Sequence, residues 1–190
     1  MLRFGNKLLL SSVALLLMTG MIPVATNVRA EPSPTVEYQV KASLIFNFLH
    51  FVDWPDDAPG GEELTVCLFG RDRYGKALRI LEGEVVNGKR LRIRESEEWS
   101  PAFTDSCSVV VFTEFVEGQR VPLEVALSAL ANKPILTIGE AKNFLEQGGV
   151  INFVTEENTV RFEINMRKAK QSKLTLSTKL LRLAQRVIGE

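Results

Sequence analysis

The apolar residues after position 35 follow two different spacings, and each spacing predicts a different kind of element. Between residues 36 and 52 they recur every three or four positions, which indicates an amphipathic helix. This helix should end before Trp54, because a residue that precedes proline disfavours helical geometry. Short, nearly continuous apolar runs indicate strands that are covered on both faces, and these runs occupy residues 64–69, 108–112 and 134–138.

Helices and hairpins are predicted between and after these strands. Helical spacing indicates helices at residues 74–81, 122–131, 141–146 and 174–188. Asn87-Gly88 favours a tight hairpin turn. Two runs with alternating apolar and polar residues suit an antiparallel pair at one edge of a sheet, and they span residues 150–154 and 160–164.

Strands that alternate with helices predict an α/β fold. The expected architecture is a single three-layer domain with a mostly parallel sheet, an antiparallel edge hairpin and helices on both faces.

Residues 1–30 resemble a secretory signal peptide. Arg3 and Lys7 precede an apolar run over residues 8–18, and a small-residue site at Ala30 precedes Glu31. The alternative is a transmembrane anchor, but the run is shorter than the roughly 20 apolar residues that a span requires. We therefore expect cleavage between Ala30 and Glu31, a mature domain over residues 31–190, and a periplasmic location.

Charge narrows the classes of partner. The chain has 23 basic and 23 acidic residues, and residues 1–30 contain three basic residues and no acidic one. The mature domain is therefore mildly acidic and lacks a basic run, which argues against binding to nucleic acid or to an anionic membrane surface. No later stretch approaches transmembrane length, so no membrane insertion is expected after cleavage.

Two cysteines, Cys67 and Cys107, are the only ones in the chain. An even number in an oxidising compartment suggests one disulfide, and their separation excludes a CxxC redox motif. The alternative is two separate buried thiols. A bridge requires the strands at 64–69 and 108–112 to be neighbours in the sheet.

The sequence offers little catalytic or ligand-binding chemistry. His50 and Asp53 have the spacing of a base and its orienting carboxylate, but no G-x-S-x-G turn supplies a nucleophile. We therefore interpret His50 as a partly exposed helix residue. Phosphate-binding glycine loops are absent from the sequence. The carboxylates lack calcium-loop spacing and are interpreted as solvated loop residues: Asp53, Asp56, Asp57, Glu62 and Glu63. The sequence thus predicts no enzyme activity, cofactor or metal site, and favours binding or regulation.

The first predicted helix carries more aromatic residues than one buried face requires. Phe46 lies off the expected inward face, so Phe46 and Trp54 are candidate contacts with a partner protein. The alternative is ordinary packing of these rings in the core. The inward face is expected to hold Val36, Val40, Leu44, Phe48 and Phe51.

Several segments, in order along the chain, resemble the YfiR family. They begin with Tyr38-Gln39-Val40-Lys41-Ala42 and Phe51-Val52-Asp53-Trp54-Pro55, and continue with Val66-Cys67-Leu68-Phe69-Gly70. Later matching blocks are Leu136-Thr137-Ile138-Gly139, Gly148-Gly149-Val150-Ile151-Asn152-Phe153, Arg161-Phe162-Glu163-Ile164-Asn165 and Ser177-Thr178-Lys179-Leu180-Leu181-Arg182-Leu183-Ala184.

The resemblance implies a periplasmic regulator that represses an inner-membrane diguanylate cyclase (YfiN-like) by binding its periplasmic sensor domain. Cyclic di-GMP and biofilm formation would then fall, and an outer-membrane OmpA-like lipoprotein would sequester the regulator. It also implies a homodimer and a Cys67–Cys107 bridge. The second cysteine pair of some family members is absent from this sequence. The alternative function is a periplasmic small-molecule receptor, with a pocket at the strand ends, that acts on another membrane signalling protein.

Overall fold

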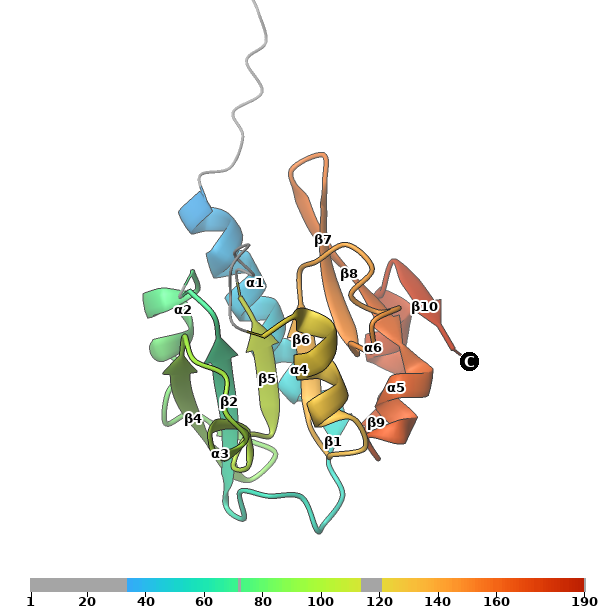
Figure 1. The fold of residues 1–190 in the computed structure, drawn as a ribbon. Coiled ribbons are helices and arrows are strands. Elements are labelled where there is room, and N and C mark those ends of the chain that lie inside the picture. The colour runs from blue at the N-terminus through green and yellow to red at the C-terminus, as the bar shows by residue number, and fades with distance from the viewer. Residues whose placement is uncertain (1–33, 72, 114–120, 190) are drawn as a thin grey trace, which may run out of the picture. The chain divides into compact units, whose positions relative to one another are not determined.

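An eight-stranded sheet runs through the part of the chain that this computed structural model describes, which comprises residues 34–71, 73–113 and 121–189 (Figure 1). The predicted signal peptide and its cleavage site between Ala30 and Glu31 lie outside these residues. The strand order is β10-β8-β7-β6-β5-β2-β4-β3. Five neighbouring strands are parallel: β4 (Lys89–Ser96), β2 (Glu63–Phe69), β5 (Val109–Phe112), β6 (Leu136–Gly139) and β7 (Ile151–Glu156).

Antiparallel pairing occurs on both sides of this parallel set. β3 (Val85–Val86) forms a hairpin with β4 at one edge. Asn87 and Gly88 make its turn with φ of 51° and 80°, a left-handed geometry that this residue pair favours. β7 pairs with β8 (Thr159–Asn165), and β10 (Arg186–Ile188) adds parallel to β8. The predicted mostly parallel sheet is thus confirmed, as are the antiparallel pairing of β7 with β8 and the small hairpin at Asn87-Gly88. The β7–β8 pair does not form the edge of the sheet, because β10 pairs with the outer side of β8.

Side chains of the buried strands alternate between two cores, which explains why helices cover both faces. In the first core, Val66 and Leu68 of β2 pack with α1 (Pro34–Leu49) and α2 (Gly75–Arg79). In the second core, on the opposite face, Cys67 and Phe69 pack where α3 (Pro101–Thr104) and α4 (Leu123–Leu130) lie. The predicted three-layer arrangement is confirmed.

The C-terminal segment differs from the single helix predicted over residues 174–188. The structure contains β9 (Thr175–Leu176), α6 (Thr178–Leu183) and β10 instead. The Ser177 hydroxyl accepts a hydrogen bond from the Leu180 N–H, which starts the helix at Thr178. Ala184 then adopts an extended conformation, because the chain turns to pair beside β8.

Two other helix boundaries also differ from the sequence prediction. The first helix ends at Leu49, and Val52 instead belongs to β1 (Val52–Asp53), which pairs antiparallel with β9. Residues 142–148 form turns where a helix was predicted. The buried Phe144 ring fills the space beside Gly139 and Gly149. The conformation of this segment therefore reflects the packing of that ring, which the helical spacing of the sequence does not report. The helix α5 (Met166–Gln171) follows β8 directly and was not predicted.

Candidate functional site

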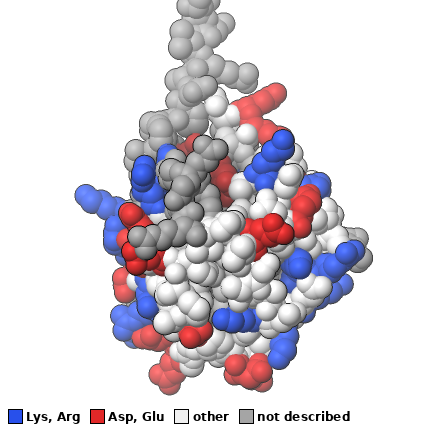
Figure 2. Space-filling view, in the orientation of Figure 1, with Lys and Arg blue, Asp and Glu red and all other residues white. Residues whose placement is uncertain are grey.

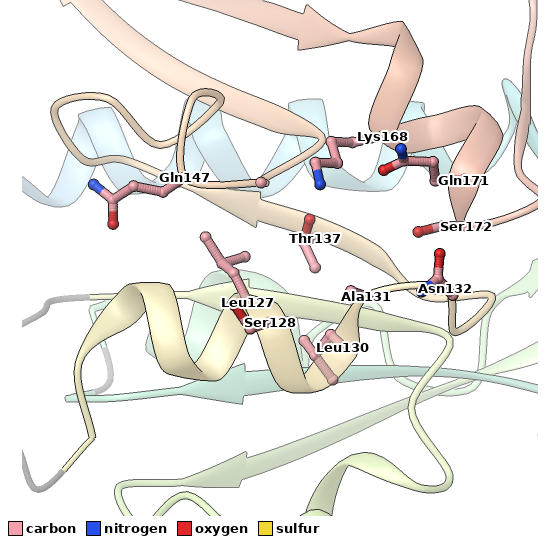
Figure 3. A pocket seen from close by; sticks show the side chains of 11 residues that line it. Leu127, Ser128, Leu130, Ala131, Asn132, Thr137, Gln147, Lys168, Gln171 and Ser172 are labelled. Atoms are coloured by element: carbon pink, nitrogen blue, oxygen red, sulfur yellow. The ribbon is translucent and has the colours of Figure 1, made fainter.

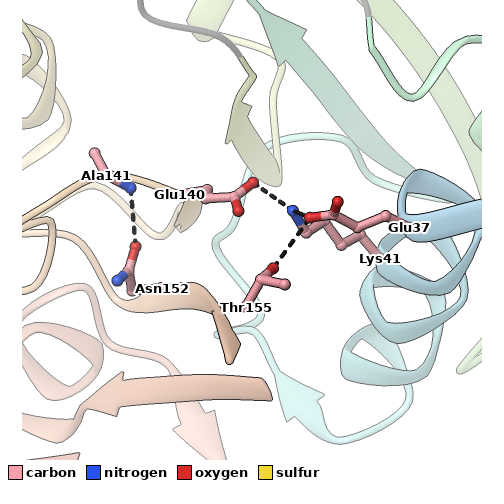
Figure 4. Close-up of polar contacts among 6 residues, drawn as sticks. All are labelled: Glu37, Lys41, Glu140, Ala141, Asn152 and Thr155. Carbon is pink, nitrogen blue, oxygen red and sulfur yellow. Dashed lines mark hydrogen bonds and ion pairs between the residues drawn. The ribbon is translucent and has the colours of Figure 1, made fainter. Parts of the chain in front are cut away.

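The first candidate feature is a buried lysine at the carboxyl edge of the parallel strands. Lys41, on α1, is fully buried, with 0% exposure. Its amino group donates to Glu37, one turn earlier on α1, and to Glu140, the residue that follows β6 (Figure 4). Thr155, near the end of β7, donates to Glu37 at 3.0 Å. These contacts fasten the N-terminal half of α1 to the ends of two strands.

Hydrogen bonds also fix the backbone that carries Glu140. The Ala141 N–H donates to Asn152 Oδ1 at 3.2 Å, and Asn152 is itself buried on β7 (Figure 4). The Lys41 amino group lies 5.1 Å from the centre of the Tyr38 ring, a cation–π distance. A buried cation therefore has two carboxylates and an aromatic face as partners, as a charge away from water requires.

These contacts affect ionisation at the site. The hydrogen bond from Lys41 and its positive charge hold the pKa of Glu37 below the ordinary value of 4.5, against the opposing effect of burial, and the Thr155 hydroxyl contributes in the same direction. Burial raises the pKa of Tyr74, whose ring contacts Tyr38 edge-on at 5.3 Å. The arrangement is suited to holding α1 in place against the ends of β6 and β7.

The outer face of α1 is the second candidate feature. Val36 and Val40 are 48% and 43% exposed, although both were predicted to point inward. The correction has a physical cause: the buried residues of α1 share one face of the helix, and Val36 and Val40 lie on the opposite face. The buried residues are Lys41, Ala42, Ile45, Phe48 and Leu49. Val36 and Val40 then face solvent beside the exposed residues Gln39, Ser43 and Asn47.

Phe46 and Trp54, the predicted partner contacts, are both half-buried. Phe46 packs against the first core and contacts the His50 ring edge-on at 5.0 Å. Trp54 packs against the same core, and its indole N–H donates to the Ser108 carbonyl at 3.1 Å. Each ring therefore combines packing inside the domain with a partly exposed surface, so both remain proposed contacts.

The catalytic and metal alternatives gain no support from the geometry. His50 and Asp53 are both exposed. Asp57 forms an ion pair with Lys173 at 3.6 Å, and Glu63 pairs with Arg92 at 2.8 Å. In the described part of the chain, no three side chains of the types that bind metals come together.

Cys67 and Cys107 lie at disulfide distance in the second core. β2 and β5 are neighbours, as a bridge between the two cysteines requires. The Cα atoms are 5.9 Å apart, within the range for a disulfide, and both side chains are fully buried.

Surface charge is locally balanced. On the face seen in Figure 2, basic and acidic side chains of the described residues are interspersed. Arg186 binds Glu163 with two hydrogen bonds, of 2.6 and 2.9 Å, and Lys133 lies 3.6 Å from Asp105. Within the described ranges, no helix is long and apolar enough to cross a membrane.

Comparison of the sequence with known families identifies the family of this chain. Residues 38–185 match the sequence model of a family described as YfiR/HmsC-like. The chain belongs to the YfiR/HmsC-like family. This family comprises periplasmic regulators of cyclic di-GMP signalling, and it is regulatory, not catalytic. A search of curated proteins found no match.

Solved structures with a similar fold are distant in sequence. A conserved domain protein from Vibrio cholerae O1 biovar El Tor strain N16961 is 11% identical with a TM-score of 0.54. The alignment covers 80% of this chain and 60% of that chain, so this chain matches only part of that protein's length. An ABC domain from Streptococcus pneumonia, solved in complex with L-Trp, is 12% identical over the same shares, with a TM-score of 0.49.

Proposed function

We propose that this protein represses an inner-membrane diguanylate cyclase by binding the cyclase's periplasmic sensor domain, which lowers cyclic di-GMP and biofilm formation. The observation that carries the proposal is the family match over residues 38–185, which covers nearly all of the described fold. An outer-membrane OmpA-like lipoprotein would compete for the regulator and release the cyclase. A homodimer is part of the same proposal.

The outer face of α1 is the proposed docking surface for the cyclase. Val36 and Val40 would be the apolar anchors, and the polar residues Gln39, Ser43 and Asn47 would form the surrounding rim. Protein interfaces commonly combine a few buried apolar anchors with such a rim. Phe46 and Trp54 would extend the contact toward the C-terminal end of α1.

The ion pairs of Lys41 support this choice. The Lys41–Glu140 ion pair fastens α1 to the end of β6, and the hydrogen bond from Thr155 to Glu37 fastens it to β7, at the end of α1 that carries Val36 and Val40. A partner would therefore meet a helix whose position is fixed before binding, which reduces the ordering cost of association.

The experiment is a measurement of intracellular cyclic di-GMP in a strain that lacks this gene. We expect cyclic di-GMP to rise in the deletion, and to fall again when the full-length gene, but not a copy without residues 1–30, is restored. Absence of a rise in the deletion would overturn the proposed function.

Matched variants test the docking surface. Val40→Glu places a charge on the outer face of α1, whereas Val125→Glu makes the same change at a valine that is 55% exposed on α4. Val40→Glu should fail to restore repression, and Val125→Glu should restore it fully, with both variants folded by circular dichroism. Equal repression by the two variants would exclude this face.

A further inference from the structure

A small cavity lies between α4, β6 and α5 (Figure 3). Its volume is about 120 Å³. Pockets for drug-sized ligands measure roughly 300–1,000 Å³, so only a small ion or a small chemical group fits here. The polar side chains around it are Ser128, Asn132, Thr137, Gln147, Lys168, Gln171 and Ser172.

Lys168 supplies the charge of this cavity. Among the described residues that line it, Lys168 is the only charged one. Asn165 caps α5 by accepting a hydrogen bond from the Lys168 N–H at 3.1 Å, which fixes where the lysine leaves the helix. The Lys168 amino group lies beside Gly148, 3.7 Å from the position that a Cβ atom would take at that glycine.

The Lys168 amino group differs from two other basic groups of the domain, those of Arg186 and Lys133. Arg186 and Lys133 each contact a carboxylate. Across residues 34–71, 73–113 and 121–189, no carboxylate or carbonyl accepts a hydrogen bond from Lys168 Nζ. A half-buried cation without a counter-charge favours an anion in the adjoining space.

Two buried hydroxyls face the same cavity. Thr137 is 4% exposed, and its Oγ1 accepts the Val150 N–H at 3.0 Å, which leaves its O–H free to donate. Ser172 is 7% exposed, and its hydroxyl has no protein partner in the described part of the chain. Figure 3 shows both hydroxyls and the Lys168 amino group around one space. Buried donors without acceptors are costly, so an acceptor is expected there.

Strand alternation explains why Thr137 faces this cavity. Leu136 and Ile138 point into the first core, so Thr137 between them points to the opposite face, toward α4. We infer that the cavity binds a small oxyanion, such as phosphate, sulfate or a carboxylate group. Lys168 would supply the opposite charge, and the hydroxyls of Thr137 and Ser172 would donate hydrogen bonds to its oxygens.

Titration of the mature protein with inorganic phosphate, sulfate and acetate tests this inference. Backbone amide resonances of Gly148 and Ser172 are followed by NMR, at an ionic strength held constant with sodium chloride. We expect saturable shifts at these two residues, and the relative affinities of the three ions identify the preferred oxyanion. No saturable shift with any of the three ions would overturn the inference.

Two lysines on the same helix provide the matched comparison. Lys168→Met removes the charge at the cavity and keeps an unbranched side chain, whereas Lys170→Met removes an exposed charge two residues away. We expect Lys168→Met to weaken binding by about tenfold or more, in line with the loss of a charge-assisted contact. Lys170→Met should bind as the wild type does.

A third variant tests the hydroxyl contribution, and thermal unfolding checks that every variant is folded. Ser172→Ala should weaken binding severalfold. Unchanged affinity in Lys168→Met, or an equal loss in Lys170→Met, would show that the shifts come from general screening and would overturn the site. This test does not involve the cyclase, so it fails or succeeds independently of the proposed repression.

Discussion

At the scale of single residues, Lys41 is a buried charge that joins the first helix to the end of β6. Its local sequence gives no sign of this role, since a lysine between apolar residues is normally solvated. Its second carboxylate, Glu140, lies 99 residues away along the chain. Sequence patterns therefore predicted the helix but placed Val36 and Val40 on its wrong face.

Acid should weaken the contact between Glu37 and Lys41. A carboxyl whose pKa is lowered by folding stabilises the protein above its ordinary pKa, and this stabilisation is lost as the pH falls through the folded value. Glu37 is such a group. We expect wild type to exceed Glu37→Gln in free energy of unfolding at neutral pH, and the difference to shrink below about pH 4.5. Denaturant titrations across pH measure it.

The control for this prediction is Glu157→Gln, which removes an exposed carboxyl from the β7–β8 turn. It should leave the free energy of unfolding close to the wild-type value at neutral pH. A wild-type advantage over Glu37→Gln that stayed constant into acid would contradict the assigned role of Glu37.

Phe144 accounts for two glycines that the sequence shows without explanation. A Cβ at Gly139 or at Gly149 would overlap the Phe144 ring, which is fully buried. Gly149→Ala should therefore lower the free energy of unfolding by about 1–3 kcal/mol through overpacking. Chemical denaturation measures this loss.

The variant Phe144→Leu tests this cause, because leucine is smaller than phenylalanine and leaves more room beside Gly149. In the Phe144→Leu background, Gly149→Ala should cost less than it does in wild type, because the two residues compete for one volume. Additive losses would mean that Gly149 is needed for a reason other than the ring.

At the scale of elements, sequence patterns predicted the buried strands well and the C-terminal elements poorly. β2 and β5 were predicted because both of their faces are apolar, a signal that lies within the strand itself. The segment after Leu174 has helical spacing. Its last part nevertheless forms β10, because it pairs with β8: Arg186 lies opposite Glu163, 23 residues earlier in the chain. Local spacing cannot report such a pairing.

Ser177 is the residue that divides this segment. Its hydroxyl caps α6 by accepting the Leu180 N–H at 3.3 Å. Ser177→Ala should lower the free energy of unfolding by about 0.5–2 kcal/mol, the usual cost of losing an N-cap. Ser43→Ala, at an exposed position in the middle of α1, is the control and should change stability little. Similar losses in the two variants would contradict the capping role.

At the scale of the whole molecule, Cys67 lies on β2, the first parallel strand along the chain, and Cys107 lies at disulfide distance from it, just before β5. These strands lie at the centre of the sheet, and residues on both of them face the second core. The sequence predicted one bridge from the number of cysteines, and it made adjacency of the two strands the condition. The strands are adjacent, so formation of the bond in the exported protein is the prediction that remains.

A bond between these cysteines would close a loop with a sequence separation of 40 residues. In the chain-entropy model such a loop stabilises the fold by about 3–4 kcal/mol. Oxidised wild type should therefore exceed the double variant Cys67→Ser/Cys107→Ser by up to about that amount in free energy of unfolding.

Unfolding under a thiol reductant separates the bond from the packing of the two side chains. Reductant should lower the stability of wild type toward that of the double variant and leave the double variant unchanged. Equal stability of oxidised and reduced wild type would show that the cysteines act only as buried apolar residues. The expected loss would make the YfiR/HmsC-like domain most stable in an oxidising compartment, which is where the proposed cyclase sensor domain would meet it.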